Sequence, residues 1–237
     1  MYRDIAKHKK YITENEMPMF KYLKVNRDTR SRKDVITKEE FTAVCKWMNH
    51  KYCNEKGITR REYIKRRVYA LVYTIHHYTG MRTKEMLTLK WNQISINPND
   101  SKWDKGINRV IHIPADYSKT GRSRDIVAPV AQQFQRLIKW YRELGLEVDE
   151  KSDNYVFVRL TDTAHNENIP TSDVAWTKRL KKVLAGAEKD GVIDLGGRNI
   201  SNYCARHHHI TEAIQRGVDV YDVALNCGTS LNYIEKT

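Results

Sequence analysis

The sequence predicts an α+β protein that is mainly helical, with a small antiparallel β-sheet inserted among the helices. Three observations lead to this fold class. Apolar residues recur at helical spacing in the first part of the chain, alternate as in strands over residues 107–130, and return to helical spacing with helix caps in the last third. A hydrophobic fraction of 40% over 237 residues is also enough to build a core.

Helix signals dominate residues 37–89. The expected helices cover residues 37–52, 60–78 and 83–89. The first begins with Thr37 and, three residues later, Glu40, which together form a capping box. Gly80 ends the second helix, and Thr83 with Glu85 is expected to cap the third.

The middle of the chain holds the expected strands. They cover residues 107–113, 125–130 and 154–158, and a helix is expected over 131–144. The first two strands alternate apolar and polar residues, and the segment Ser118-Lys-Thr-Gly-Arg-Ser between them has the composition of a turn. Gly145 closes the helix that follows them.

Helices return in the last third. They are expected over residues 171–188, 199–215 and 221–226, with a last helix from Ser230. The segment Thr171-Ser-Asp caps the first of them, and either Asn199 or Ser201 caps the second. Gly217 and Gly228 are expected to stop the second and third helices.

The chain is strongly basic, with a formal net charge of +13, and the excess charge is concentrated near its start. The densest run contains Lys21, Lys24, Arg27, Arg30, Arg32 and Lys33. With few apolar residues to bury, residues 1–36 are expected to form an extended arm. Its partner would be a polyanion such as DNA, or the arm is a solvated linker without a fixed partner. A membrane surface fits less well, because no apolar helix face accompanies the charges.

Other compartments and cofactors are not indicated. The longest apolar run, Val68–Tyr73, is too short to span a bilayer, and residues 1–7 lack the apolar stretch of an export signal. The four cysteines form no CxxC pair. We therefore expect a soluble, cytoplasmic protein with reduced thiols. Three adjacent histidines, 207–209, point about 100° apart on a helix and are not expected to share a metal ion.

One segment places an arginine in the turn between two predicted helices. Arg82 is followed three residues later by Glu85, which can hold its guanidinium. By itself this pair could be an ordinary surface ion pair. However, the string Thr79-Gly-Met-Arg-x-x-Glu-x-Leu-x-Leu-x-Trp-x-x-Ile resembles the first arginine box of the tyrosine recombinases, the phage integrase family.

Later segments extend this resemblance over residues 37–237. Lys119 lies in the predicted hairpin turn, where the family carries a catalytic lysine. The second arginine box, usually His-x-x-Arg-His, reads Tyr203-Cys-Ala-Arg206-His207, and the third, usually Leu-Gly-His-Ser, reads Cys227-Gly-Thr229-Ser230. Tyr203 and Thr229 thus replace histidines, and both can still donate a hydrogen bond to a phosphate oxygen but carry no charge.

The resemblance implies site-specific recombination of double-stranded DNA attachment sites through a 3′-phosphotyrosine intermediate. Arg82 and Arg206 would stabilise charge on the phosphate, Lys119 would protonate the leaving oxygen, and Tyr203 and Thr229 would steady the phosphate. Neither a cofactor nor a metal is implied, and the family acts as a homotetramer on DNA. The basic residues Lys178, Arg179, Lys181 and Lys182 are either a DNA-facing stripe or a solvated face.

The family's nucleophilic tyrosine would fall at position 238, one residue after Thr237. Residues 37–237 are therefore expected to be a catalytic domain that ends just before its nucleophile, and residues 1–36 the link to a core-binding domain. Tyr233 is expected to be a packing aromatic rather than the nucleophile. Two alternatives remain: a non-catalytic DNA-binding relative, or a type IB topoisomerase with the same chemistry but no strand exchange.

Overall fold

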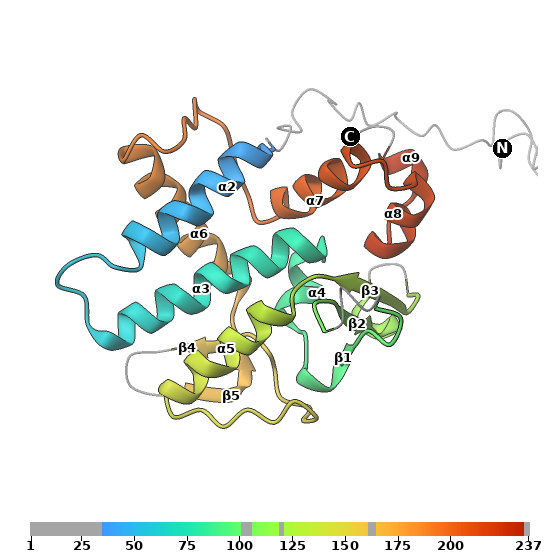
Figure 1. The fold of residues 1–237 in the computed structure, drawn as a ribbon, viewed down its shortest axis with the longest axis horizontal. Helices are drawn as coiled ribbons and strands as arrows, with labels where there is room; N and C mark the ends of the chain where they lie inside the picture. The colour runs from blue at the N-terminus through green and yellow to red at the C-terminus, as the bar shows by residue number, and fades with distance from the viewer. Residues whose placement is uncertain (1–34, 101–105, 119–120, 161–164, 235–237) are drawn as a thin grey trace, which may run out of the picture. The chain divides into compact units, whose positions relative to one another are not determined.

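A 20-residue helix, α3 (Arg60–Thr79), lies at the centre of the helical part of the protein (Figure 1). The structure is a computed structural model that describes residues 35–234 except 101–105, 119–120 and 161–164, with only the backbone of residues 165–168. Helix α3 packs against α5 (Ala131–Glu143) and α7 (Cys204–Gln215). Gly80 ends α3 in a left-handed conformation with φ 60°, as predicted from the glycine.

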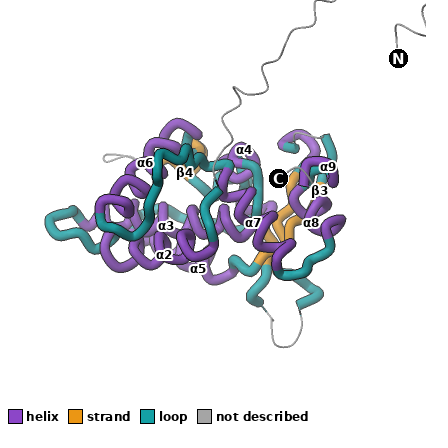
Figure 2. The backbone as a smooth tube through the Cα atoms, turned by 90° about the horizontal axis from the view of Figure 1, so that it is seen from above, coloured by secondary structure: helices purple, strands orange, loops and turns teal. Residues whose placement is uncertain are grey.

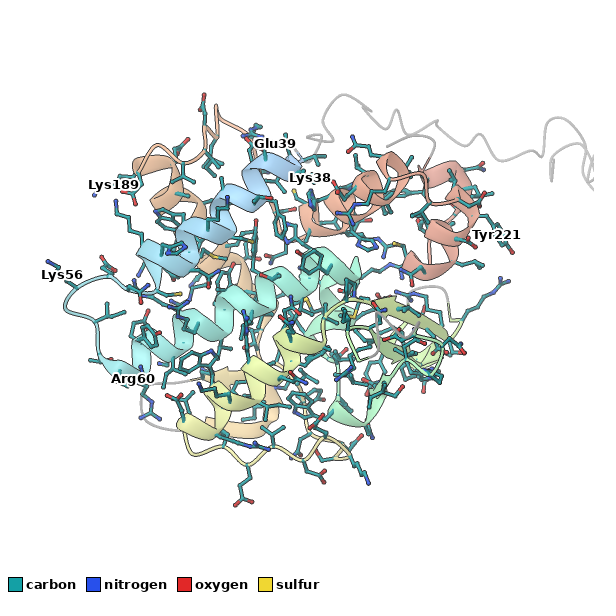
Figure 3. All side chains as sticks on the ribbon, in the orientation of Figure 1. Lys38, Glu39, Lys56, Arg60, Lys189 and Tyr221 are labelled. Carbon is teal, nitrogen blue, oxygen red and sulfur yellow. The ribbon has the colours of Figure 1, made fainter. Side chains whose placement is uncertain are left out.

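Helix α2 (Lys38–Trp47) starts with the predicted capping box. The backbone N–H of Thr37 donates to Glu40 Oε2 at 2.9 Å, and the N–H of Glu40 donates to Thr37 Oγ1 at 3.2 Å. The helix continues as a π-helical turn, Met48–Tyr52, and packs against α6 (Asp173–Lys189). At the start of α2, Lys38 forms an ion pair with Glu212 of α7 at 3.0 Å (Figure 3).

A three-stranded antiparallel sheet follows the first helices. Its strands are β1 (Ile94–Ile96), β2 (Arg109–Ile113) and β3 (Arg124–Ala128), in the order β1-β2-β3. The inward residues Ile111 and Ile126 face each other across β2 and β3 and are fully buried. The predicted hairpin is confirmed, whereas β1 was not expected, because a strand of three residues carries too little alternation to detect.

The short strand predicted over residues 154–158 is wrong in its position. A two-stranded sheet forms instead from β4 (Val158–Leu160) and β5 (His165–Pro170), and β5 was not expected. Residues 154–156 run beside the end of the segment predicted as a helix over 83–89, where Val156 N donates to the carbonyl of Leu89 at 2.8 Å. Only an isolated bridge between Lys90 and Tyr155 forms there, so the apolar run is buried without becoming a strand.

The last third contains α6, α7, α8 (Val220–Cys227) and α9 (Leu231–Ile234). Neither Asn199 nor Ser201 caps α7, which begins at Cys204 after a turn. The turn is fixed by Asn202, whose side chain donates to Thr177 on α6 at 2.9 Å. Helices α8 and α9 pack on α7 around a small second apolar cluster: Ile210, Val223, Ala224, Cys227 and Ile234.

The shorter helix expected over residues 83–89 is α4 (Thr83–Leu87), and its cap differs from the prediction. Arg82 rather than Thr83 occupies the N-cap position, and its backbone N–H donates to Glu85 Oε2 at 2.9 Å. Among the helices that the structure describes, none combines the length and apolar composition needed to cross a membrane.

Candidate active site

Arg82 lies in the turn between α3 and α4 and is held on two sides. Its Nη1 donates to Glu85 Oε1 at 2.7 Å, and its Nη2 donates to the carbonyl oxygen of Gly228, 146 residues away in the sequence. Glu85 also accepts from the Arg82 backbone, so a single carboxylate fixes both the main chain and the side chain of the arginine. The arrangement joins the first and third boxes of the sequence.

Arg206, on the first turn of α7, is almost completely buried, with 1% of its surface exposed. Its Nη1 donates to the carbonyl oxygen of Gly80 at 2.9 Å, and its Nε has no hydrogen-bond partner among the residues that the structure describes. Burial lowers the pKa of Arg206, and the neighbouring charge of Arg82 lowers it further. Burial of a guanidinium near a second positive charge is unfavourable, and a bound anion would offset that cost.

The Glu85 carboxylate is shared with a third arginine. Arg124, at the start of β3, donates from Nη2 to Glu85 Oε2 at 2.7 Å and from Nη1 to Oε1 at 3.1 Å. Burial alone would raise the pKa of Glu85, whose side chain is 1% exposed, but the bonds from Arg124 and Arg82 lower it. Glu85 is thus held ionised in a buried position.

Arg124 was not among the residues proposed from the sequence, although a signal for it exists. It occupies the same face of β3 as the buried residues Ile126 and Ala128. Arg124 lies one residue before the strand predicted over 125–130 but continues its alternation, and a charged residue at an inward position requires a buried partner. The partner, Glu85, is 39 residues away, so the sequence alone does not identify it.

The third box lies at the end of α8, beside β3 (Figure 2). Gly228 ends α8 with φ 62°, and its carbonyl accepts the bond from Arg82. The carbonyl of Asn226 accepts a bond from Arg124 Nε at 3.1 Å. Thr229, a proposed site residue, follows directly and is half-buried, with its N–H bonded to the carbonyl of Ala224 at 3.0 Å.

Tyr203 and Tyr233 lie together although 30 residues separate them. Their hydroxyl oxygens are 3.1 Å apart, and the Tyr233 hydroxyl is also 3.3 Å from His207 Nε2. The ring of Tyr203 meets that of His207 edge-on at 4.9 Å. Tyr233 thus bonds to two side chains of the second box, a contact that its position in the sequence did not reveal.

The three adjacent histidines contact three different parts of the protein. His207 reaches Tyr233, His208 Nδ1 is 3.2 Å from the carbonyl of Ile36, and His209 Nδ1 is 3.2 Å from the carbonyl of His77. Their divergence agrees with the expected 100° steps along the helix. They therefore serve three separate contacts rather than one shared site.

Part of the proposed basic stripe on α6 is internal. Arg179 donates to Glu62 at 3.1 Å and to the hydroxyl of Tyr52 at 3.2 Å, so it ties α6 to α3. Lys178, Lys181 and Lys182 are exposed. Lys119 and the basic residues Lys21, Lys24, Arg27, Arg30, Arg32 and Lys33 lie outside the described residues.

Taken together, the described residues form a site with more positive than negative charge. Arg82 and Arg124 share one carboxylate, Glu85, and the charge of Arg206 lies near them. Two of these arginines, Arg82 and Arg206, come from different helical segments and are fixed by backbone carbonyls. Preorganised guanidiniums of this kind suit a phosphate group whose negative charge increases during reaction.

Known proteins share the sequence pattern and the fold of this chain. The pattern of the phage integrase family matches residues 35–228. No curated protein sequence matches the chain. Among solved structures, the post-cleavage complex of XerH site-specific recombinase with its palindromic difH substrate superposes with a TM-score of 0.60 at 18% identity, covering 86% of this chain and 48% of that one.

Two further recombinase structures are similar. The Tn1549 transposon integrase in complex with circular intermediate DNA gives a TM-score of 0.58 at 15% identity over 99% of this chain and 69% of that chain. XerA recombinase gives 0.54 at 14% identity over 86% and 58%. The chain thus spans about half the length of XerH, and at these identities the likeness concerns the fold.

The helical fold with its inserted antiparallel sheet is shared with the site-specific recombinase XerH and the Tn1549 transposon integrase. The chain belongs to the phage integrase family.

Proposed function

We propose that this chain is the catalytic domain of a site-specific DNA recombinase, an integrase that breaks and rejoins DNA through a 3′-phosphotyrosine intermediate. The observation that carries the proposal is that Arg82 and Arg206 are each held by a backbone carbonyl, Arg82 by that of Gly228 and Arg206 by that of Gly80. Both guanidiniums are held before any substrate arrives. They therefore need little reorganisation when charge develops on a phosphate.

In this reaction a tyrosine oxygen attacks phosphorus and a 5′-hydroxyl leaves. Arg82 and Arg206 stabilise the negative charge on the non-bridging oxygens, and Tyr203 and Thr229 donate neutral hydrogen bonds to the same phosphate. Lys119 acts as the general acid that gives a proton to the leaving oxygen. The covalent phosphotyrosine keeps the energy of the broken bond, so the strand can be resealed without a nucleotide cofactor.

The proposed partner is double-stranded DNA carrying attachment sites. The XerH and Tn1549 integrase structures are complexes with DNA. Residues 1–36 would form a basic arm along the DNA backbone, and the active assembly would be a homotetramer in the cytoplasm of a bacterial host. Residues 37–237 would supply the site to that assembly.

The test is covalent capture on nicked DNA. The complete reading frame that contains this chain, including any codons after that of Thr237, is expressed. Its binding sites are selected from randomised duplexes, and nicked versions of those sites are incubated with the protein. We expect a protein–DNA adduct that survives denaturing gels, and peptide mapping by mass spectrometry to identify its tyrosine. Arg82→Ala and Arg206→Ala should abolish the adduct, whereas Arg198→Gln, which alters an arginine bonded to Glu40, should keep it.

A second candidate is a DNA-binding relative that does not cut. The neutral Tyr203 and Thr229, at positions usually held by histidine, favour this alternative. Selected sites that are bound without any adduct would identify it and refute the enzyme. Relaxation of plasmids without strand exchange would instead identify a type IB topoisomerase.

A further inference from the structure

Arg124 connects three parts of the site that are far apart in the sequence. It begins β3, it pairs with Glu85 on α4, and its Nε donates to the carbonyl of Asn226 on α8. A second bond joins the same elements, because Val127 N donates to the side chain of Asn226 at 3.3 Å. Strand β3 is thus docked on the first and third boxes.

Arg82 and Arg124 share the Glu85 carboxylate in a way that leaves one terminal nitrogen of Arg82 free of it. Arg82 uses only Nη1 for the Glu85 side chain, and its Nη2 reaches Gly228. Arg124 occupies both carboxylate oxygens from the other side, at 2.7 and 3.1 Å. Without Arg124, the carboxylate would keep only the bonds from the backbone N–H and the Nη1 of Arg82, and a carboxylate and a guanidinium favour a two-bond pairing. That pairing would draw Arg82 away from Gly228.

Arg124 also sets the path of the third box. A Cβ atom on Gly228 would lie 2.8 Å from Arg124 Cζ, closer than nonbonded carbon atoms approach. The backbone at Gly228 therefore lies directly on the guanidinium, whose side chain is only 10% exposed. Thr229 is the residue after Gly228, so the position of the Arg124 side chain determines the position of Thr229.

We propose that Arg124 is a positioning residue: through the carboxylate of Glu85 and the backbone of residues 226–228, it fixes Arg82 and Thr229 in the places from which they bind a phosphate. The inference rests on the proposed function. Besides Arg82 and Arg124, the charged or titratable groups that influence Glu85 or are influenced by it are His76 on α3, Arg206 on α7 and Cys227 on α8. None of these bonds the carboxylate in the part of the chain that the structure describes.

Sulfate is a suitable probe, because it carries the charge of a phosphate and does not titrate between pH 5 and 8. Its affinity is measured by calorimetry for the unmodified chain, Arg124→Gln, Arg124→Lys and Arg198→Gln. Arg198 also pairs with a glutamate, Glu40, away from the site, and therefore serves as the matched control. We expect a loss of about tenfold in Arg124→Gln, comparable to the loss of an orienting partner behind a metal ligand, and no change in Arg198→Gln.

Two further measurements separate positioning from a general loss of structure. The Nε–H resonance of Arg82, in protein labelled with ¹⁵N-arginine, should shift in Arg124→Gln and stay in place in Arg198→Gln. When Glu85 is already changed to Gln, adding Arg124→Gln should lower the sulfate affinity little further, because the carboxylate through which Arg124 acts is gone. Arg124→Lys keeps the charge but lacks the planar guanidinium that donates two bonds to a carboxylate. It should therefore recover less than half of the lost sulfate affinity on a logarithmic scale.

The outcomes distinguish this inference from the proposed function. If Arg124→Gln binds sulfate as tightly as the unmodified chain and leaves the Arg82 resonance unshifted, the positioning role is refuted while the anion site stands. If the unmodified chain binds sulfate no better than Arg82→Gln, the anion site itself is refuted. The Arg82 resonance still decides whether Arg124 positions that side chain.

Discussion

Arg206 donates a hydrogen bond from Nη1 to the carbonyl oxygen of Gly80 at 2.9 Å, across 126 residues of sequence. Gly80 follows the last residue of α3, where backbone carbonyls lack partners within the helix and the helix dipole is negative. A buried cation is stabilised at such a place. The same glycine leads directly into the turn that holds Arg82, so a single carbonyl sets the distance between the first and second boxes.

Replacing Arg206 is expected to impair cleavage far more than stability. Arg206→Lys keeps one charge but cannot both bond Gly80 and present a second donor to a phosphate. We expect covalent capture to slow roughly 100- to 1000-fold, the usual cost of removing such a donor. Arg216→Gln, an exposed change at the C-cap of the same helix, should leave the rate unchanged. A rate within threefold of the unmodified protein in Arg206→Lys would contradict this role.

Gly80→Ala should destabilise the protein more than a glycine change with the same backbone strain. An added Cβ at Gly80 would lie 2.5 Å from His209 Cδ2, whereas at Gly145, with φ 79°, it would meet nothing within 4 Å. In urea unfolding we expect Gly145→Ala to cost about 1 kcal/mol for the left-handed conformation and Gly80→Ala about 3 kcal/mol. Equal losses would show that His209 moves aside freely.

Tyr233→Phe should have a modest structural effect. The change removes the bonds to Tyr203 and His207, and a hydrogen bond of this kind contributes about 1 kcal/mol. We expect the free energy of unfolding to fall by that amount and covalent capture to persist. Tyr221→Phe, an exposed tyrosine on α8 (Figure 3), is the control. Complete loss of the adduct in Tyr233→Phe alone would identify Tyr233 as the nucleophile and overturn the packing role.

Buried histidines should make stability fall in mild acid. Burial lowers the pKa of both His76 and His209 from 6.5 to about 4, and the nearby charge of Arg206 contributes. The unfolded chain therefore binds protons that the folded protein does not. Stability is full above pH 6.5 and is lost as the pH falls toward 4, by up to about 1.4 kcal/mol per pH unit for each histidine.

Urea unfolding at pH 7.5, 6.0 and 5.0 checks this dependence. His209→Gln should flatten the profile, whereas His50→Gln, a change at an exposed position, should leave it as steep as before. A profile in the unmodified protein that is flat from pH 7.5 to 5.0 would show that these histidines titrate normally.

The basic run near the start of the chain should determine the salt dependence of DNA binding. Changing Lys21, Lys24, Arg27, Arg30, Arg32 and Lys33 to Ser should reduce the slope of log affinity against log salt by up to about 5, because each phosphate contact contributes about 0.9. The control changes Lys178, Lys181 and Lys182, which are exposed on α6. A larger effect from the control set would move the DNA interface to α6.

Local chemistry was enough to predict much of the fold. The Thr37–Glu40 capping box, the end of α3 at Gly80 and the β2–β3 hairpin depend on neighbours in the sequence, and all are confirmed. The predicted start of α7 was wrong, because neither Asn199 nor Ser201 caps the helix, which begins only at Cys204. Between them and the helix, the side chain of Asn202 bonds Thr177 on α6 and holds the chain in a turn where the local pattern predicted a helix.

The sequence by itself determined the family, the residue types of the boxes and the order in which they occur, because motifs and caps are properties of short segments. Only the tertiary structure decided which groups hold them: Gly80 for Arg206, Gly228 for Arg82, and Arg124 for Glu85. The sequence does not indicate which backbone carbonyl will lie near a given side chain, and a buried charge meets its partner only when the chain has folded. The physical reason is that these bonds join segments 39 to 146 residues apart.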